Sequence, residues 1–286
     1  MKEDDEKEMS FLDHLEELRW HVIRSLVAIV VFMVLAFIFS REIFDNVIFA
    51  PAKTDFLTFR AMCKLGHLIG YEEAMCVKEI PMKIQSRLMT GQFTMALTSS
   101  FIIGLIVAFP YVAWEMWRFI KPGLHANERK YSRGAVAAIS FMFFLGTSFG
   151  YYVMCPVSVY FLASYQISDM IQNEFDIISY VGTVTTLVLG SGILFQLPVV
   201  VYFLTRVGII STAMLKSVRR HALVGILVVA AVITPPDPIS QTIVAIPLYL
   251  LYEFSIFIAR FVERAKAREE AEEEARDAAL QRTDET

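Results

Sequence analysis

Apolar residues in this chain are grouped in six long runs that are separated by polar connections. The runs cover residues 22–40, 93–114, 134–157, 177–205, 222–233 and 239–252, and only Arg24 interrupts the first. A helix of about 20 apolar residues crosses the ~30 Å hydrocarbon core of a bilayer. The first four runs reach that length, so the pattern predicts membrane-spanning helices.

The last two runs are shorter than a full membrane span. As a helix, residues 222–233 extend only ~18 Å at ~1.5 Å per residue. We expect one of three adjustments: the helix thins the bilayer locally, it draws the side chains of Arg219, Arg220 and His221 into the bilayer by snorkelling, or it is a re-entrant segment. The TPPDP sequence at residues 234–238 then forces a turn, because proline cannot continue a helix. The fold class predicted is all-α, with six transmembrane helices of which the final two are short.

Prolines and small residues within the runs predict how these helices bend and pack. Pro110, Pro198 and Pro247 each free a backbone carbonyl, and bent helices would enclose a concave wall. Small residues at 146–150 and 190–192 favour close contact between helices. A concave bundle is therefore expected.

Basic residues indicate the orientation of the chain. Residues 1–24, 117–133, 206–220 and 260–286 carry 4, 5, 4 and 6 Lys or Arg, whereas residues 157–176 and 234–239 carry none. Cytoplasmic connections retain positive charge, so both termini are predicted to be cytoplasmic. The connection at about 41–90 is then external. It holds 7 basic residues between Arg41 and Arg87, but 6 acids accompany them and its length weakens the rule.

The ends of the chain differ from its apolar body. Residues 1–9 are acidic and predicted to be disordered, residues 10–261 form the membrane domain, and residues 262–286 form a charged cytoplasmic tail. The first apolar run is too long for a cleavable signal peptide, so we expect it to remain as an anchor. With 56% apolar residues and a mean hydropathy of +0.51, the composition excludes an ordinary soluble domain.

Two of the three cysteines share the external connection. Cys63 and Cys76 can form a disulfide in an oxidising compartment or remain as two free thiols, and both alternatives are compatible with the sequence. Cys155 is expected to pack at a helix end.

Enzyme and cofactor signatures are weak. The GTSFG sequence at 146–150 matches G-x-S-x-G, but a nucleophile elbow needs a strand-to-helix turn and this copy lies in an apolar run. His14 and Glu17 form one i,i+3 pair without a second, which argues against a metal site. We expect no catalytic residue, no metal, no cofactor and no nucleic-acid partner.

Polar residues within or beside the runs have structural and functional interpretations. Gln196 either satisfies a carbonyl freed near Pro198 or binds a partner helix. Glu115, between Trp114 and Trp117, is expected to be an interfacial anchor. Glu253 is expected to reach the inner interface or to pair with nearby bases.

Two carboxylates are predicted at the inner rim. Glu128 lies in the segment FIKPGLHANERK, among Arg118, Lys121, Arg129, Lys130 and Arg133, and Glu17 lies in HLEELR. A carboxylate in a basic loop can receive the arginines of another chain. The alternative is that Glu128 pairs with Arg129 or Lys130 in its own loop.

Five segments in order match one family. They are SFLDHLEELR at 10–19, FIKPGLHANERK at 119–130, FLGTSFGYYVMCP at 144–156, FQLPV at 195–199 and TPPDPISQ at 234–241. From about residue 10 to 261 the chain resembles the TatC family, the polytopic core of the twin-arginine protein translocase. The resemblance implies a cupped bundle of six helices with two short final helices.

The resemblance also implies functional residues. Binding of twin-arginine signal peptides is implied for Glu17, Arg19, Phe119, Pro122 and Glu128. Positions on the outer side are Pro51, Asp237 and Gln241. Gln196 and Pro198 match an intramembrane site for partner subunits, at which the family commonly has Glu in place of Gln196.

The expected function is that of a receptor in the cell inner membrane. It would bind signal peptides of folded cargo proteins, recruit single-span TatA- or TatB-type subunits, and assemble with other copies of itself, with the proton gradient driving transport. A secondary transporter of a small solute or ion is the alternative, although the middles of these runs carry almost no ionisable residues. A third interpretation, an intramembrane hydrolase, is supported only by the GTSFG sequence at 146–150.

Overall fold

The computed structural model describes residues 11–70, 75–120, 134–168, 170–233 and 238–284, and every predicted run lies on one or more helices. The chain divides into two compact units. Unit 1 comprises Met1–Phe141 and Ala163–Thr185, and unit 2 comprises Met142–Leu162 and Thr186–Thr286. The helices α7 (Ala135–Phe149), α8 (Cys155–Ser164) and α9 (Ile177–Leu194) each contribute residues to both units.

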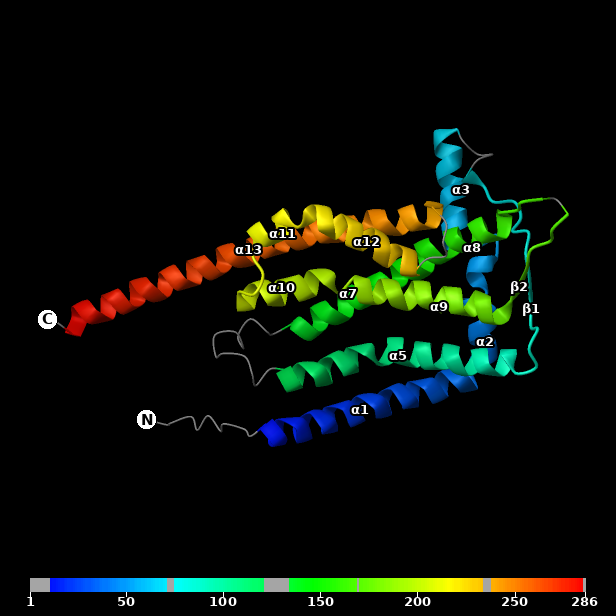
Figure 1. Ribbon diagram of the computed structural model, residues 1–286. Coiled ribbons are helices and arrows are strands. Elements are labelled where there is room, and N and C mark those ends of the chain that lie inside the picture. Colours follow the sequence, from blue (N-terminus) through cyan, green and yellow to red (C-terminus); the bar gives the residue numbers. More distant parts are fainter. Residues whose placement is uncertain (1–10, 71–74, 121–133, 169, 234–237, 285–286) are drawn as a thin grey trace. The chain divides into compact units, whose positions relative to one another are not determined.

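Unit 1 is built on two long antiparallel helices, α1 (Phe11–Ile38) and α5 (Gly91–Ile120), which lie side by side (Figure 1). Their backbones come close at Gly104, where a Cβ atom would lie 2.6 Å from the backbone nitrogen of Met33. The absence of a side chain at this position lets the two helices approach closely.

The other elements that lie wholly within unit 1 are shorter than this pair. They are α2 (Ser40–Ile43), the π-helical turn η1 (Phe44–Ile48), the 3-10 turn η2 (Ala50–Ala52), α3 (Leu57–Ile69), β1 (Lys83–Gln85) and β2 (Glu174–Asp176). The strands pair in parallel, with Ile84 opposite Phe175. Alternation over three residues is too brief to predict a strand, so this ladder was not visible in the sequence.

The carboxylate of Asp176 connects the start of α9 to the backbone of Arg87. It accepts hydrogen bonds from the backbone N–H of Ile178 (2.8 Å) and of Arg87 (3.0 Å). These two bonds, in that order, lower the pKa of Asp176 below its ordinary value because they favour the charged form. In addition, the hydroxyl of Tyr180 donates to the carbonyl of Ile48 at 2.8 Å, which attaches η1 to α9.

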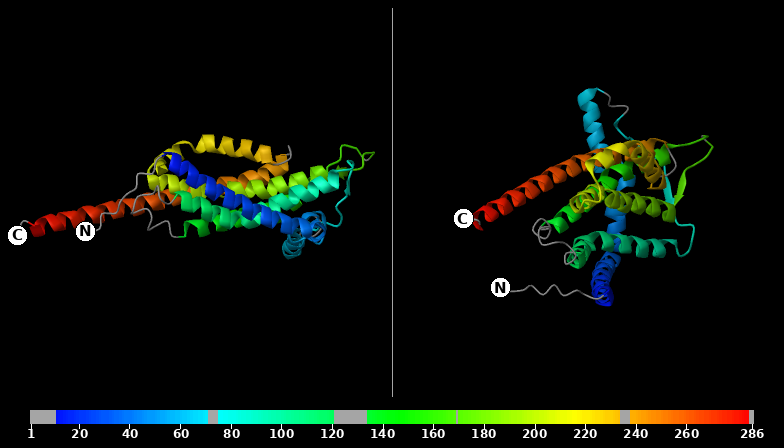
Figure 2. Two further views of the ribbon diagram at one scale, coloured as in Figure 1. Left: turned by 90° about the horizontal axis from the view of Figure 1, so that it is seen from below. Right: turned by 60° about the vertical axis from the view of Figure 1, so that its left-hand side comes forward.

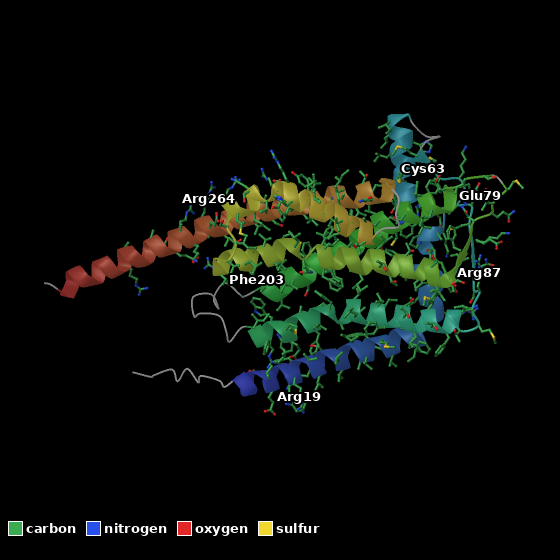
Figure 3. The ribbon with its side chains drawn as sticks, in the orientation of Figure 1. Arg19, Cys63, Glu79, Arg87, Phe203 and Arg264 are labelled. Atoms are coloured by element: carbon green, nitrogen blue, oxygen red, sulfur yellow. A yellow bond between two sulfur atoms is a disulfide. The ribbon has the colours of Figure 1, made fainter. Side chains whose placement is uncertain are left out.

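Cys63 and Cys76 are joined by a disulfide, so the bonded alternative holds in this structure. Cys63 lies on α3 (Figure 3). Both sulfurs lie within 4.8 Å of a nitrogen of His67, the spacing of a metal site. The disulfide occupies both thiols, so this trio is not a metal centre as it stands. Cys155 is buried and is not part of a disulfide.

Unit 2 contains the second halves of α7 and α9, followed by the C-terminal helices. Its complete elements are the π-helical turn η4 (Gly150–Met154), α10 (Leu197–Val207), α11 (Thr212–Ser217), α12 (Arg219–Ile233) and α13 (Pro238–Asp284). A Cβ atom on Gly146 would lie 2.6 Å from the carbonyl oxygen of Ser191, so α7 and α9 meet at small residues as predicted. The GTSFG sequence is helical, without the strand of a nucleophile elbow.

Proline acts differently in different helices. A break at residues 195–196 separates α9 from α10, and Pro198 lies in the first turn of α10, where a missing N–H costs little. Pro110 and Pro247, in contrast, lie inside the continuous helices α5 and α13.

The two final helices differ in length. The 15 residues of α12 agree with the predicted short helix. The last helix does not agree, because α13 has 47 residues and continues past both residue 252 and the expected domain boundary at 261 (Figure 2). Glu253 ended the charge-free run, but glutamate is a good helix former, and its carboxylate pairs with Arg219 at 2.8 Å. The Ala, Glu and Arg residues that follow are strong helix formers.

Five stretches of the described chain are long and apolar enough to cross a membrane. They are Leu15–Ile38, Gly91–Ile120, Ala135–Ser164, Ile177–Val207 and Gln241–Glu269. With the shorter α12 between the last two, the predicted six apolar helices are all present.

Candidate functional site

A buried hydrogen bond between side chains joins α1 to α5 one turn from the end of α5. Nδ1 of His21 lies 2.5 Å from Oε2 of Glu115, and the imidazole N–H donates to the carboxylate. The Glu115 residue is 1% exposed and His21 is 5% exposed. A buried carboxylate without a hydrogen-bond partner is costly, so this contact holds Glu115 in position.

The second oxygen of the Glu115 carboxylate also has partners. The hydroxyl of Tyr111 donates to Oε1 at 3.0 Å, and Nη1 of Arg118 lies 3.9 Å from the same atom. Tyr111 and Arg118 lie four residues before and three residues after Glu115, on one face of α5. Glu115 is therefore held by its own helix as well as by α1.

His21 connects this buried pair to two residues predicted to bind peptides. Its Nε2 atom lies 4.0 Å from Oε1 of Glu17, one helical turn earlier on α1. Its ring also contacts Phe119 edge-on, with centroids 6.2 Å apart. Phe119 lies one turn after Glu115 on α5, as His21 lies one turn after Glu17 on α1. These two pairs, on facing helices, form one cluster. We call Glu17, His21, Glu115 and Phe119 the rim cluster.

The remaining residues predicted for this site are not placed in the rim cluster. Arg19 is exposed, stacks over Trp20 at 5.8 Å, and lies on the side of α1 turned away from α5 (Figure 3). Pro122 and Glu128 lie outside the described residues, as does the basic loop from Lys121 to Arg133.

Sequence reasoning was wrong about Glu115 and missed His21. Glu115 was expected to be an interfacial anchor beside tryptophans, but it is buried, and Trp114 is the exposed residue that stacks with Arg118 at 4.9 Å. The available signal was the spacing of His21, four residues after Glu17. Such spacing shows which residues share a face of one helix. It does not show which other helix packs against that face, because this depends on the tertiary fold.

The predicted residues of unit 2 occupy helix ends. Gln196 precedes the first turn of α10, where its carbonyl accepts from the N–H groups of Val199 and Val200. Pro198 is buried. The Gln241 amide donates to the carbonyl of Leu227 at 3.1 Å, which links α13 to α12.

Two residues predicted for the outer side remain. Pro51 is buried in η2 of unit 1. Asp237 lies outside the described residues.

The sequence profile described as Sec-independent protein translocase protein (TatC) matches residues 13–247. The chain belongs to the TatC family. The TatC protein of Blattabacterium sp. subsp. Periplaneta americana is 40% identical over 92% of this chain and 99% of its own length. The TatC protein of Deinococcus radiodurans is 36% identical over 87% of this chain and 84% of its own length.

Solved structures agree with this membership. A crystal structure of the twin arginine translocase receptor TatC is 27% identical, covers 87% of this chain and 99% of its own, and superimposes with a TM-score of 0.65. A second TatC crystal structure, in DDM, is 29% identical and covers 86% of this chain and 99% of its own. Its TM-score is 0.68. The chain is thus a membrane component of the Sec-independent protein translocase and not an enzyme. Membership in TatC replaces both the small-solute transporter and the hydrolase alternatives.

Proposed function

We propose that this TatC protein is the receptor for twin-arginine signal peptides of folded cargo, and that the rim cluster forms part of the binding site. The main support is the position of His21, which contacts both Glu17 and Phe119 while it is anchored by Glu115. Two residues that family resemblance alone assigned to peptide binding are thereby parts of one rigid contact network.

The chemistry of Glu17 fits an arginine ligand. Its side chain is 40% exposed, and its closest ion-pair contact among the described residues is the 4.0 Å approach to His21. Carboxylate oxygens therefore remain available, and a guanidinium binds a carboxylate bidentately in a way that lysine cannot match. We propose that Glu128 supplies the second carboxylate and that Arg19 and Pro122 line the same site.

Contacts between connections support the membrane topology in unit 1. Strands β1 and β2 belong to two different connections, and pairing requires both on one side of the membrane. The contact of Glu17 with His21 and of His21 with Glu115 likewise brings the N-terminal segment and the end of α5 to the same side. With the distribution of basic residues, this favours a cytoplasmic N-terminus and an external connection at 41–90.

Unit 2 supports the same scheme for the C-terminus. Arg206 pairs with Glu269 at 2.6 Å, so the basic connection after α10 and the charged part of α13 share one side. We therefore propose that both termini are cytoplasmic in the cell inner membrane. In this scheme residues 1–9 are a tail, the proton gradient drives transport, and other copies of the chain join the complex.

The receptor proposal is tested by titrating labelled Arg-Arg and Lys-Lys peptides against the protein in nanodiscs. Removing one member of a desolvated charge pair costs about 2–5 kcal/mol, or roughly 30-fold to several thousand-fold in affinity. We expect losses of this size for Glu17→Ala and Glu128→Ala with the Arg-Arg peptide. The matched control is Glu16→Ala, an exposed neighbour. Equal affinities for all variants and both peptides would exclude this site.

Recruitment of single-span TatA- or TatB-type subunits is assigned to Gln196 and Pro198. Gln196 lies at the break between α9 and α10, where a helix of another subunit can bond to an amide. An intramembrane hydrogen bond contributes about 1 kcal/mol, so Gln196→Leu should weaken co-purification of such a subunit. Unchanged co-purification and export would leave Gln196 a packing residue.

A further inference from the structure

A cavity lies at the other end of the α1–α5 pair from the rim cluster. Its volume is about 520 Å³, within the range of small-molecule sites. It is an open pocket that is bordered by α2 and η1, by β1, by the first two turns of α5 and by the start of α9. The lining residues are Ser40, Arg41, Phe44, Asp45, Phe49, Ile84, Gln85, Ser86, Gln92, Ala96 and Ile177.

This cavity presents one cation and one anion. Arg41 and Asp45 are four residues apart, and within the described part of the chain neither side chain belongs to an ion pair. Lys53 is nearby, but its ammonium donates to the backbone carbonyl of Asp45 at 2.8 Å. A guanidinium and a carboxylate on one wall are complementary to a ligand that carries both charges.

The rest of the lining suits a headgroup better than a fully hydrated ion. Phe44 and Phe49 meet edge to face with centroids 5.5 Å apart and form an apolar wall. The Ser86 hydroxyl donates to the carbonyl of Leu88, whereas Gln92 brings an amide to the lining from the first turn of α5.

Exposed apolar side chains continue from the cavity along both long helices. Phe37 near the end of α1 contacts Phe93 in the first turn of α5, with centroids 6.2 Å apart, and Phe93 is 63% exposed. Leu97 and Phe101 extend this exposed surface along α5. Because α1 and α5 are predicted spans, this surface faces lipid chains, and the cavity lies where those chains meet water.

We propose that the cavity binds the headgroup of a zwitterionic phospholipid that carries a primary ammonium group, phosphatidylethanolamine by class. Arg41 holds the phosphate, Asp45 and Gln92 hold the ammonium, and the acyl chains lie along Phe37 and Phe93. An anionic lipid without an ammonium would leave Asp45 unpaired. A choline headgroup has no N–H to donate to Asp45. The site is independent of the signal-peptide proposal.

Native mass spectrometry of the delipidated protein tests this assignment. Phosphatidylethanolamine, phosphatidylcholine and phosphatidylglycerol with identical acyl chains are compared as ligands. We expect phosphatidylethanolamine to bind about 5- to 10-fold more tightly than the other two, the value of one charge-assisted hydrogen bond at a partly exposed site. Asp45→Asn should remove this preference, and Arg41→Gln should weaken all three lipids.

Matched controls are available in the same unit. Arg60 and Asp55 are exposed and do not line the cavity, so Arg60→Gln and Asp55→Asn should bind like the unaltered protein. Thermal unfolding of each variant verifies that the fold is intact. Equal affinity for the three lipids, or equal effects of Arg41→Gln and Arg60→Gln, would overturn the proposal. Displacement of the lipid by inorganic phosphate would also overturn it, since that identifies a site for free anions.

Discussion

At the scale of single residues, Glu115 is the charge on which the rim cluster depends. Its carboxylate is buried, receives hydrogen bonds from His21 and Tyr111, and lies near Arg118. Each partner offsets part of the cost of placing an ion away from water. The same contacts position His21, which in turn contacts Glu17 and Phe119.

We predict that Glu115→Ala destabilises the protein by about 3 kcal/mol, because it leaves the buried His21 imidazole without its acceptor. Thermal unfolding in detergent measures the change. Glu115→Gln keeps an acceptor oxygen and should lose less. The exposed Glu16→Ala serves as the control and should change stability by less than about 0.5 kcal/mol. Similar shifts for Glu115→Ala and Glu16→Ala would show that the buried pair contributes nothing.

At the scale of elements, two sets of contacts hold unit 1 together. One is the close approach of α1 and α5 at Gly104, and the other is the attachment of α9 to β1 through Asp176. Both act on backbone atoms, so a conservative substitution is enough to test each of them.

Gly104→Ala is expected to destabilise unit 1. The new Cβ atom would lie within 3 Å of backbone atoms of both Ile29 and Met33, and α1 must shift to admit it. Overpacking of this kind costs about 1–3 kcal/mol. Gly182→Ala is the control, since nothing lies within 4 Å of its Cβ position and a helical Gly→Ala change gains about 0.5–1 kcal/mol. Unfolding of both variants in detergent should therefore shift in opposite directions.

Asp176 gives the stability of unit 1 a dependence on pH. Its pKa is lowered in the folded protein, so its charge stabilises the fold above the unfolded pKa of about 3.9, and this contribution is lost as pH falls through the lower folded pKa. Asp176→Asn can still cap α9 but carries no charge. The variant should be less stable than the unaltered protein at neutral pH and equal to it under acid conditions. A difference that is constant with pH would contradict this account.

At the scale of the whole molecule, the C-terminal charged segment is part of the folded structure. Oε1 of Glu263 accepts from the N–H of Thr212 at 2.6 Å, and Glu269 pairs with Arg206. Both acids lie in the segment after residue 261 that the sequence assigned to a tail. They join α13 to α10 and α11 beyond the apolar part of the bundle.

Truncation separates this structural segment from the rest of α13. We expect removal of all residues after Phe261 to lower the stability of the protein by about 2 kcal/mol or more, from the lost bonds of two charged groups. Removal of residues after Glu270 retains both contacts and should leave the melting temperature unchanged. Equal melting temperatures for the two truncations would reduce the segment 262–270 to a solvated tail.

The sequence by itself determined the helices and the family. Apolar runs located the six apolar helices because burial in a bilayer depends on local composition and length. They did not reveal the shorter helices α3 and α11. Five motifs in order identified TatC. Local patterns also predicted the short α12 and close helix contact at the small residues that include Gly146.

Only the tertiary structure decided which side chains meet. His21 and Glu115 are 94 residues apart, and nothing within either segment shows that a histidine and a carboxylate will share a buried site. The same holds for β1 with β2, for Arg41 beside the first turn of α5, and for Arg219 with Glu253. Composition and periodicity describe one segment at a time, whereas the energy of a buried charge depends on the partner that another segment brings to it.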